Sequence, residues 1–81
     1  MSQLTRTPKQ LGSALRQRRR SMKLTQGQLA GLIGLRQATI SDVENGHEGS
    51  KLSTVLSMLA GLELEIHIAP RSQGGDFTEF F

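Results

Sequence analysis

The sequence predicts a mostly α-helical domain of four to five helices followed by one β-strand. In four stretches between residues 7 and 62, apolar residues recur with the 3.6-residue spacing of helices that bury one face. From Glu63 to Ile68, polar and apolar residues instead alternate strictly, which is typical of a strand. Gly34 separates two helical stretches, where a left-handed conformation would end one helix and redirect the chain.

Composition limits the class of protein. The 81 residues make one domain, and with 36% hydrophobic residues and only three aromatics a single copy buries a modest core. There is no cysteine and no apolar run near the roughly 20 residues that span a bilayer. We therefore expect a cytoplasmic protein with no disulfide, no Cys-based metal site and no membrane contact.

Charge is distributed unevenly along the chain. Residues 1–45 contain eight Lys or Arg and two acidic residues, a net charge of +6, whereas residues 46–81 contain two basic and five acidic residues, a net charge of −3. The first part suits a polyanion and the second does not. This asymmetry indicates two different partners.

The first helix is expected to run to about Met22, after a short disordered arm at residues 1–6. Thr7 can cap this helix, Pro8 suits its first position, and Gln10 can complete a capping box. The helix belongs to a domain that we place at residues 7–62.

Arg19 falls on the apolar line of the first helix, together with Leu15. An unpaired charge buried there would be costly, so Arg19 needs a carboxylate partner. The other arginines of the helix point elsewhere, and they are either merely solvated or available to phosphate groups: Arg16, Arg18 and Arg20.

The second helix begins with a capping box formed by Thr25 and Gln28, which places Gln26 in its exposed first turn. The third helix is expected from about Arg36 to Glu44. Its spacing turns these residues inward: Ala38, Thr39 or Ile40, and Val43. Its outer face presents Arg36, Gln37, Ser41 and Asp42. Such groups can read base edges in a major groove, but a solvated polar face is ordinary on a surface helix, so residue type alone is weak evidence for base reading.

Ser50 or Ser53 can cap the fourth helix, which should end near Gly61. Its apolar stripe consists of Leu52, Val55, Leu56, Leu59 and Leu62.

The strand at residues 63–70 has no second strand in the chain to pair with. Its unpaired backbone groups are most simply satisfied by the same strand of another copy, which predicts a homodimer with a two-stranded antiparallel sheet across its twofold axis. Leu64, Ile66 and Ile68 would then face the helices.

Residues 71–81 read as a flexible tail with an aromatic terminus. All three aromatic residues of the protein lie here: Phe77, Phe80 and Phe81. Buried aromatic side chains dominate protein interfaces, so the tail is interpreted as an anchor for another protein. The alternative is that it folds back on its own dimer.

A set of residues across positions 8–62 resembles the Xre-type, lambda-repressor-like helix-turn-helix family: Thr25-Gln26, Leu29-Ala30, Ile33-Gly34, Gln37, Ile40-Ser41 and Glu44-Asn45-Gly46. More narrowly, residues 37–41, the junction at residues 62–64 and the following strand are similar to HipB-type antitoxins, which partner HipA-type serine/threonine kinase toxins.

The resemblance implies roles for particular residues. Arg19 would pair with Glu44 as a structural ion pair. Bases would be read by Arg36, Gln37, Ala38 and Thr39. DNA phosphates would be contacted by Gln26, Ser41, Asn45 and Lys51, to which the basic face of the first helix adds Arg16 and Arg20. Arg36 departs from the family pattern, because many members carry a Ser or Thr cap there.

Two functions are therefore expected. The first is a nucleoid-associated, sequence-specific autorepressor and antitoxin that binds a palindromic or pseudopalindromic operator as a homodimer and neutralises a HipA-like kinase toxin. The second is a stand-alone Xre-family repressor whose tail serves only dimer stability. An enzyme is not expected, because His47 and His67 are isolated and no catalytic, metal or cofactor pattern accompanies them.

Overall fold

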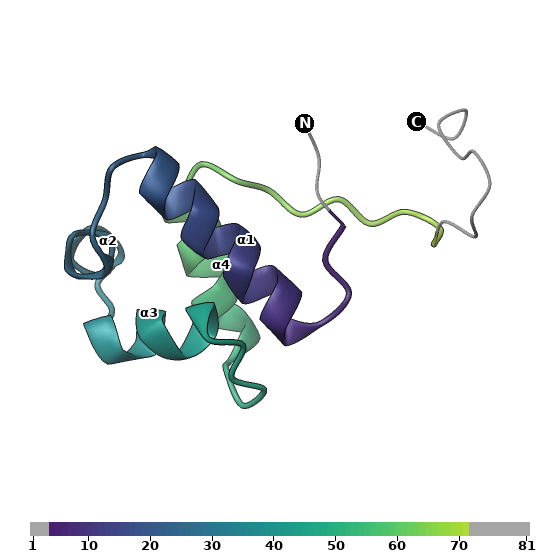
Figure 1. Cartoon of the computed structure of the whole chain (residues 1–81), viewed down its shortest axis with the longest axis horizontal. Coiled ribbons are helices and arrows are strands. Elements are labelled where there is room, and N and C mark those ends of the chain that lie inside the picture. Colours follow the sequence, from purple (N-terminus) through teal and green to yellow (C-terminus); the bar gives the residue numbers. More distant parts are fainter. Residues whose placement is uncertain (1–3, 72–81) are drawn as a thin grey trace.

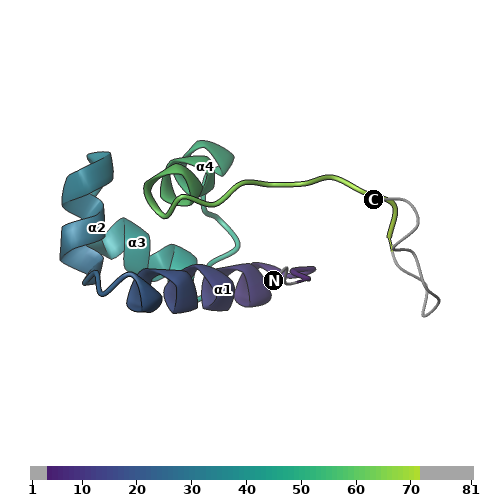
Figure 2. The ribbon, with the colours of Figure 1, turned by 90° about the horizontal axis from the view of Figure 1, so that it is seen from above.

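The computed structural model describes residues 4–71, and this part of the chain contains four helices (Figure 1). They are α1 (Pro8–Ser21), α2 (Gln26–Ile33), α3 (Gln37–Glu44) and α4 (Leu52–Gly61). Helix α1 packs against α3, and α2 packs against both α3 and α4. Figure 2 shows α1 and α4 on opposite sides of the bundle, with α3 between them. The predicted α-helical class and the positions of all four helices are confirmed.

The core of the described residues is wholly aliphatic. It contains side chains from all four helices and from the residue that follows α4: Leu15, Leu29, Ala30, Ile40, Val43, Val55, Met58, Leu59 and Leu62. Most of these positions were predicted from the helical spacing, because a residue that recurs every three or four positions shares one face of a helix. None of the helices in residues 4–71 is long and apolar enough to cross a membrane.

The predicted helix starts are largely confirmed. The Thr7 side chain accepts a hydrogen bond from the Gln10 backbone N–H (3.0 Å), but the Gln10 side chain accepts from the Arg6 backbone N–H (2.7 Å), so the expected capping box does not close. Thr25 and Gln28 do form a complete capping box at α2. Gly34 ends α2 in the left-handed conformation, with φ 72° and ψ 31°, as expected.

Several predicted orientations are wrong. Ala38 is exposed rather than inward, because only Ile40 and Val43 of α3 enter the core. Leu52 and Leu56 are also exposed, since the buried stripe of α4 is narrower than its apolar sequence. Neither Ser50 nor Ser53 caps α4, where Lys51 takes the cap position without a side-chain hydrogen bond.

Residues 63–71 follow α4 outside any helix and extend away from the bundle (Figures 1 and 2). Only Leu64 of the predicted strand packs against the core, whereas Ile66 is half exposed and Ile68 is 96% exposed, so Ile68 does not face the helices of its own chain. These nine residues form no strand within the single copy, and pairing with a second copy stays a prediction.

The predicted docking residues of the tail, Phe77, Phe80 and Phe81, lie outside the described residues, as do residues 1–3 of the predicted arm.

Close packing of α1 on α3 depends on a residue without a side chain. Gly12 of α1 is buried, and a Cβ atom built on it would lie 2.6 Å from the carbonyl oxygen of Glu44 and against the carbonyl oxygen of Val43. Backbone atoms cannot move aside as the end of a flexible side chain can. The crossing of the two helices therefore requires glycine at this position.

We expect Gly12→Ala to lower the free energy of unfolding by about 1–3 kcal/mol, the usual cost of overpacking. Urea unfolding followed by circular dichroism at a fixed protein concentration measures this change. The matched control is Gly31→Ala, on α2, where a Cβ atom meets nothing within 4 Å and helix propensity should instead add about 0.5–1 kcal/mol. Equal stability of the two variants would contradict this account of the α1–α3 contact.

Candidate nucleic-acid interface

A buried ion pair joins α1 to the end of α3. Arg19 Nε donates to Glu44 Oε2 at 2.6 Å and Arg19 Nη2 donates to Glu44 Oε1 at 3.0 Å. The two residues are only 7% and 4% exposed. Arg19 Nη1 also donates to the Leu24 carbonyl oxygen at 2.8 Å, which fixes the turn between α1 and α2. The structure therefore places the predicted pair in contact, with the bidentate geometry that suits guanidinium and carboxylate groups.

Two further side chains donate to the same carboxylate. Gln26 Nε2 donates to Glu44 Oε1 at 3.0 Å, and Arg16 Nε donates to that oxygen at 3.3 Å. Burial alone would raise the pKa of Glu44, but the hydrogen bonds from Arg19, Gln26 and Arg16 and the charge of Arg19 together lower that pKa below its ordinary value. The hydrogen bond to Glu44 likewise raises the pKa of Arg19, so both members of the pair stay charged.

Hydrogen bonds continue from this carboxylate to the surface of α3. On one side, Gln37 Nε2 donates to Gln26 Oε1 at 3.4 Å. On the other side, Arg16 Nη2 donates to Asn45 Oδ1 at 3.0 Å and Asn45 Nδ2 donates to Ser41 Oγ at 3.3 Å. Four side chains that the sequence assigned to phosphates and one that it assigned to bases thus meet around Glu44. Except for Asn45 and Ser41, which are four positions apart, the partners lie 11 to 29 positions apart, so no local sequence pattern predicts these links.

The start of α3 presents the residues expected to read bases. Arg36, Gln37 and Ala38 are exposed, and Thr39 is half-buried. Arg36 occupies the cap position without a side-chain hydrogen bond, so its guanidinium is not committed to holding the helix start. Ile40 and Val43 anchor the opposite face of α3 in the core. Residues 36–39 therefore lie together at the start of α3, and the packing of Ile40 and Val43 in the core fixes the orientation of this helix.

The basic residues Arg18, Arg20 and Lys51 differ in what they contact. Within residues 4–71, Arg20 and Lys51 are exposed and form no ion pair, so their charges are available. Arg18 is instead held at the end of α4, where its Nε donates to the Leu62 carbonyl oxygen at 2.9 Å and its Nη2 lies 3.8 Å from Glu63 Oε1. The expectation that Arg18 is solvated or meets phosphates missed this structural contact.

Lys51 also lies at a polar hollow of about 340 Å³ beside α3, which Thr39, Asp42 and Ser50 help to line. In residues 4–71, no three His, Cys, Asp or Glu side chains are grouped so that they could hold a metal ion. The described site consists of hydrogen-bonding groups and cations on a rigid helix, an arrangement that can bind a polyanion and hydrogen-bond base edges.

Comparison with known proteins defines the class. A family model described as a helix-turn-helix domain matches residues 10–67. The chain belongs to this helix-turn-helix family. Within it, the chain is similar to the antitoxin HipB of two Escherichia coli strains, O6:H1 and K-12, at 40% identity over 60 residues. The match covers 74% of this chain and 64% and 68% of the two relatives, so the chain spans about two thirds of their length.

Solved structures agree with this assignment. A complex of a HipB variant with an O2 20-mer superposes with a TM-score of 0.84 at 35% identity, covering 89% of this chain and all of that one. HipB in a HipA–HipB–O2–O3 complex gives a TM-score of 0.82 at 35% identity, covering 88% of this chain and all of that one.

We expect the Arg19–Glu44 pair to make stability fall in acid. In the unfolded chain Glu44 takes its ordinary pKa of 4.5, and in the folded protein its pKa is lower. The contribution of its carboxylate is therefore complete above pH 4.5 and is lost as the pH falls from there through the folded pKa. Urea unfolding at a series of pH values from 7 to 3 would measure this loss.

Glu44→Gln should lower the free energy of unfolding at neutral pH by about 3–5 kcal/mol, because it leaves the Arg19 guanidinium buried without a counter-charge. It should also flatten the acid limb of the stability curve. Glu48→Gln is the control, since Glu48 is exposed and forms no ion pair within residues 4–71. If the two variants gave the same acid limb, Glu44 would not be the group that titrates.

Proposed function

We propose that this protein is a sequence-specific DNA-binding autorepressor and the antitoxin of a HipBA-like toxin–antitoxin system. The observation that carries the proposal is the exposed start of α3, residues 36–39, on a helix that hydrogen bonds to Glu44 hold in place. The chain that carries this helix superposes on HipB solved together with a 20-mer O2. Such a protein is a regulator and not an enzyme, and it works in the cytoplasm at the nucleoid.

Two sets of residues contact the DNA: one contacts the base edges and the other contacts the phosphates. Arg36, Gln37, Ala38 and Thr39 enter the major groove, where Arg can bridge guanine, Gln can bridge adenine, and the methyl groups of Ala and Thr can meet that of thymine. The residues assigned to phosphates supply salt-dependent affinity for any sequence: Gln26, Ser41, Asn45, Lys51, Arg16 and Arg20. Because Arg16 and Gln26 already donate to Glu44, they approach a phosphate in a fixed orientation.

The protein binds its operator as a homodimer. Ile66 and Ile68 expose apolar surface on a segment that leaves the bundle in an extended course, and Leu56 exposes more on α4. Pairing residues 63–70 of two copies would bury this surface and satisfy the backbone of both strands. A twofold dimer then presents two α3 helices to half-sites about 34 Å apart or a multiple of that distance, on a pseudopalindromic operator.

A HipA-like serine/threonine kinase toxin is the second partner. The support is the similarity to HipB, of which one solved complex also contains HipA. The tail residues that bind the toxin are Phe77, Phe80 and Phe81. Aromatic side chains contribute much of the binding energy at interfaces, and the core of the described residues contains none. In the stand-alone repressor alternative, the same tail would only stabilise the dimer.

Gln37→Ala is expected to lower operator affinity by about 1–3 kcal/mol and to leave affinity for random DNA unchanged, because it removes one bidentate base contact. Arg20→Ala should weaken binding to both DNAs alike and reduce the salt dependence by about one phosphate contact. Fluorescence anisotropy with operator and random duplexes at several salt concentrations measures both effects.

The matched control is Gln17→Ala, which alters an exposed glutamine on α1 and should change neither affinity. If Gln37→Ala and Arg20→Ala each affected operator and random DNA equally, the separation of base-reading from phosphate contacts would be wrong.

Deletion of residues 76–81 is expected to abolish co-purification with a HipA-like kinase while operator affinity and the dimer persist. The control is Asp76→Asn with Glu79→Gln, which removes the charges of the tail and keeps its aromatic residues. Sedimentation velocity and pull-down on the same samples give the two readouts. Loss of the dimer on truncation would favour the stand-alone repressor.

A further inference from the structure

Asp42 lies on the outer face of α3, among side chains that are otherwise neutral or basic. Between residues 4 and 47 the only acidic residues are Asp42 and Glu44. Glu44 is buried and paired with Arg19, so Asp42 carries the one exposed negative charge in this part of the chain. Its carboxylate forms no ion pair within residues 4–71. A charge of this sign works against binding a polyanion, so its position calls for a reason.

The direction of Asp42 follows from the residues that α3 buries. These are Ile40, Val43 and Glu44. The helical repeat of 3.6 residues per turn puts Asp42 about 150° around the helix from the middle of this buried side. Ala38 is exposed one turn earlier, and residues four positions apart on a helix have Cβ atoms roughly 5–6 Å apart. Asp42 therefore lies on the same outer stripe as Ala38, one of the residues proposed to read bases.

Asp42 also shares the polar hollow beside α3 with a cation. Thr39, Asp42 and Lys51 all line this hollow, yet the two charged residues form no ion pair with each other. Both charges are therefore available to a ligand. A ligand that satisfies both presents an anionic group to Lys51 and a hydrogen-bond donor to Asp42. Duplex DNA does so, because its phosphates flank base edges that carry amino groups.

We propose that Asp42 is a specificity-determining residue that accepts a hydrogen bond from N4 of a cytosine in the operator and disfavours DNA without that cytosine. The inference rests on the proposed function, because it needs α3 to lie in a major groove. The amino groups exposed there are cytosine N4–H₂ and adenine N6–H₂. Adenine presents its N7 acceptor beside the amino group, and this acceptor repels a carboxylate, so cytosine fits better.

The carboxylate contributes discrimination rather than affinity. On random DNA it meets keto oxygens or ring nitrogens that offer no proton, and the water it loses is not replaced. At the correct sequence, the hydrogen bond from cytosine replaces that water. Specificity is a difference between two affinities, so a group that penalises the wrong DNA raises it as much as one that rewards the right DNA.

The test selects duplexes from a randomised pool with the full chain and with two variants. The wild-type protein should select one C·G pair in each half-site, and changing that cytosine should weaken binding by roughly 5- to 150-fold. Asp42→Ala should remove the preference at this pair and keep the preferences at other positions. Asp42→Asn should shift the preference to adenine, because an Asn side chain can donate to N7 and accept from N6–H₂.

Both variants should also bind random duplexes more tightly than the wild type does. The expected gain is roughly fivefold at low salt, which corresponds to removing one repulsion between unit charges about 4 Å apart in water. The gain should shrink as salt is added, because exposed charges are screened. Fluorescence anisotropy measures these affinities, and circular dichroism verifies that each variant keeps its helices.

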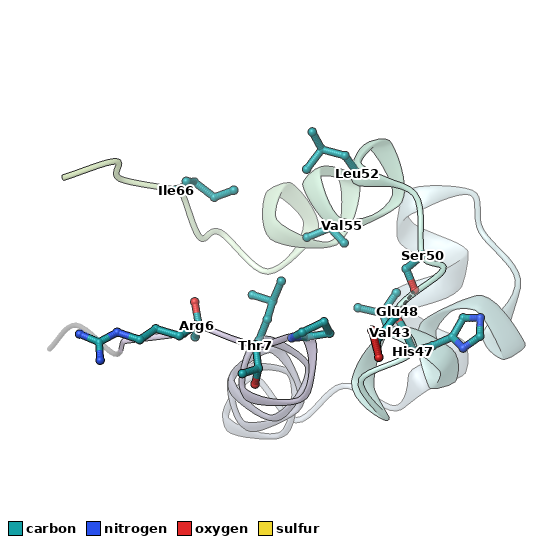
Figure 3. Close-up of a pocket in the computed structure, with 12 residues that line it drawn as sticks. Arg6, Thr7, Val43, His47, Glu48, Ser50, Leu52, Val55 and Ile66 are labelled. Atoms are coloured by element: carbon teal, nitrogen blue, oxygen red, sulfur yellow. Dashed lines mark hydrogen bonds between the residues drawn. The ribbon is translucent and has the colours of Figure 1, made fainter. Parts of the chain in front are cut away.

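Glu48→Gln is the matched control, because Glu48 is also exposed and forms no ion pair within residues 4–71. Glu48 lines a groove between α1 and α4 that Val55 and Ile66 also line (Figure 3), and it does not line the polar hollow beside α3. This variant removes the same charge from a different site. It should leave the base preference unchanged and raise the affinity for random DNA by less than either Asp42 variant does.

Two results would overturn the proposal while the wild-type protein still binds its operator. Equal gains for Asp42→Asn and Glu48→Gln, with no change of base preference, would mean that Asp42 acts only through net charge. Loss of binding to every duplex in Asp42→Ala would mean that Asp42 supports affinity or the fold. A wild-type protein that selects no sequence would instead overturn the proposed function, and this inference with it, so the two failures are distinguishable.

Discussion

The Arg19–Glu44 pair is the interaction on which the rest of the structure depends. Each charge would be costly to bury alone, and each is tolerated because the other lies within hydrogen-bonding distance. The pair connects α1 to the end of α3, and the Gln26 side chain brings the start of α2 to the same carboxylate. Three helices are thereby fixed relative to one another by directional contacts, which an aliphatic core alone would not specify so narrowly.

The same contacts link the stability of the domain to the surface that we propose contacts DNA. Gln37 is positioned through Gln26, and Asn45 through Arg16, so that groups on the outer face of α3 are oriented by the buried carboxylate. The basic half of the chain therefore serves two purposes. Some cations hold the fold together, whereas Arg20 and Lys51 are exposed, and we propose that their charges meet DNA phosphates. Preorganised side chains lose less conformational freedom when a ligand binds.

Much of the fold could be predicted because its signals are local. Helical spacing, the Thr25 cap and Gly34 each involve residues within four positions of one another, and all three predictions are confirmed. Arg19 on an apolar line also indicated a buried partner. Exposure was predicted less well: Ala38, Leu52 and Leu56 were expected inside and lie outside, because the buried width of a helix depends on which neighbours cover it. That information is not contained in the helix itself.

The sequence by itself determined the helices, the caps at Thr7 and Thr25 and the need of Arg19 for a counter-charge, because these follow from spacing and side-chain chemistry along one segment. Only the tertiary structure decided that Arg16 and Gln26 converge on Glu44, that Arg18 is held at the end of α4, and that a groove opens beside Ile66. The reason is physical: these features form where segments far apart in the chain come into contact, and a local sequence pattern does not predict such contacts.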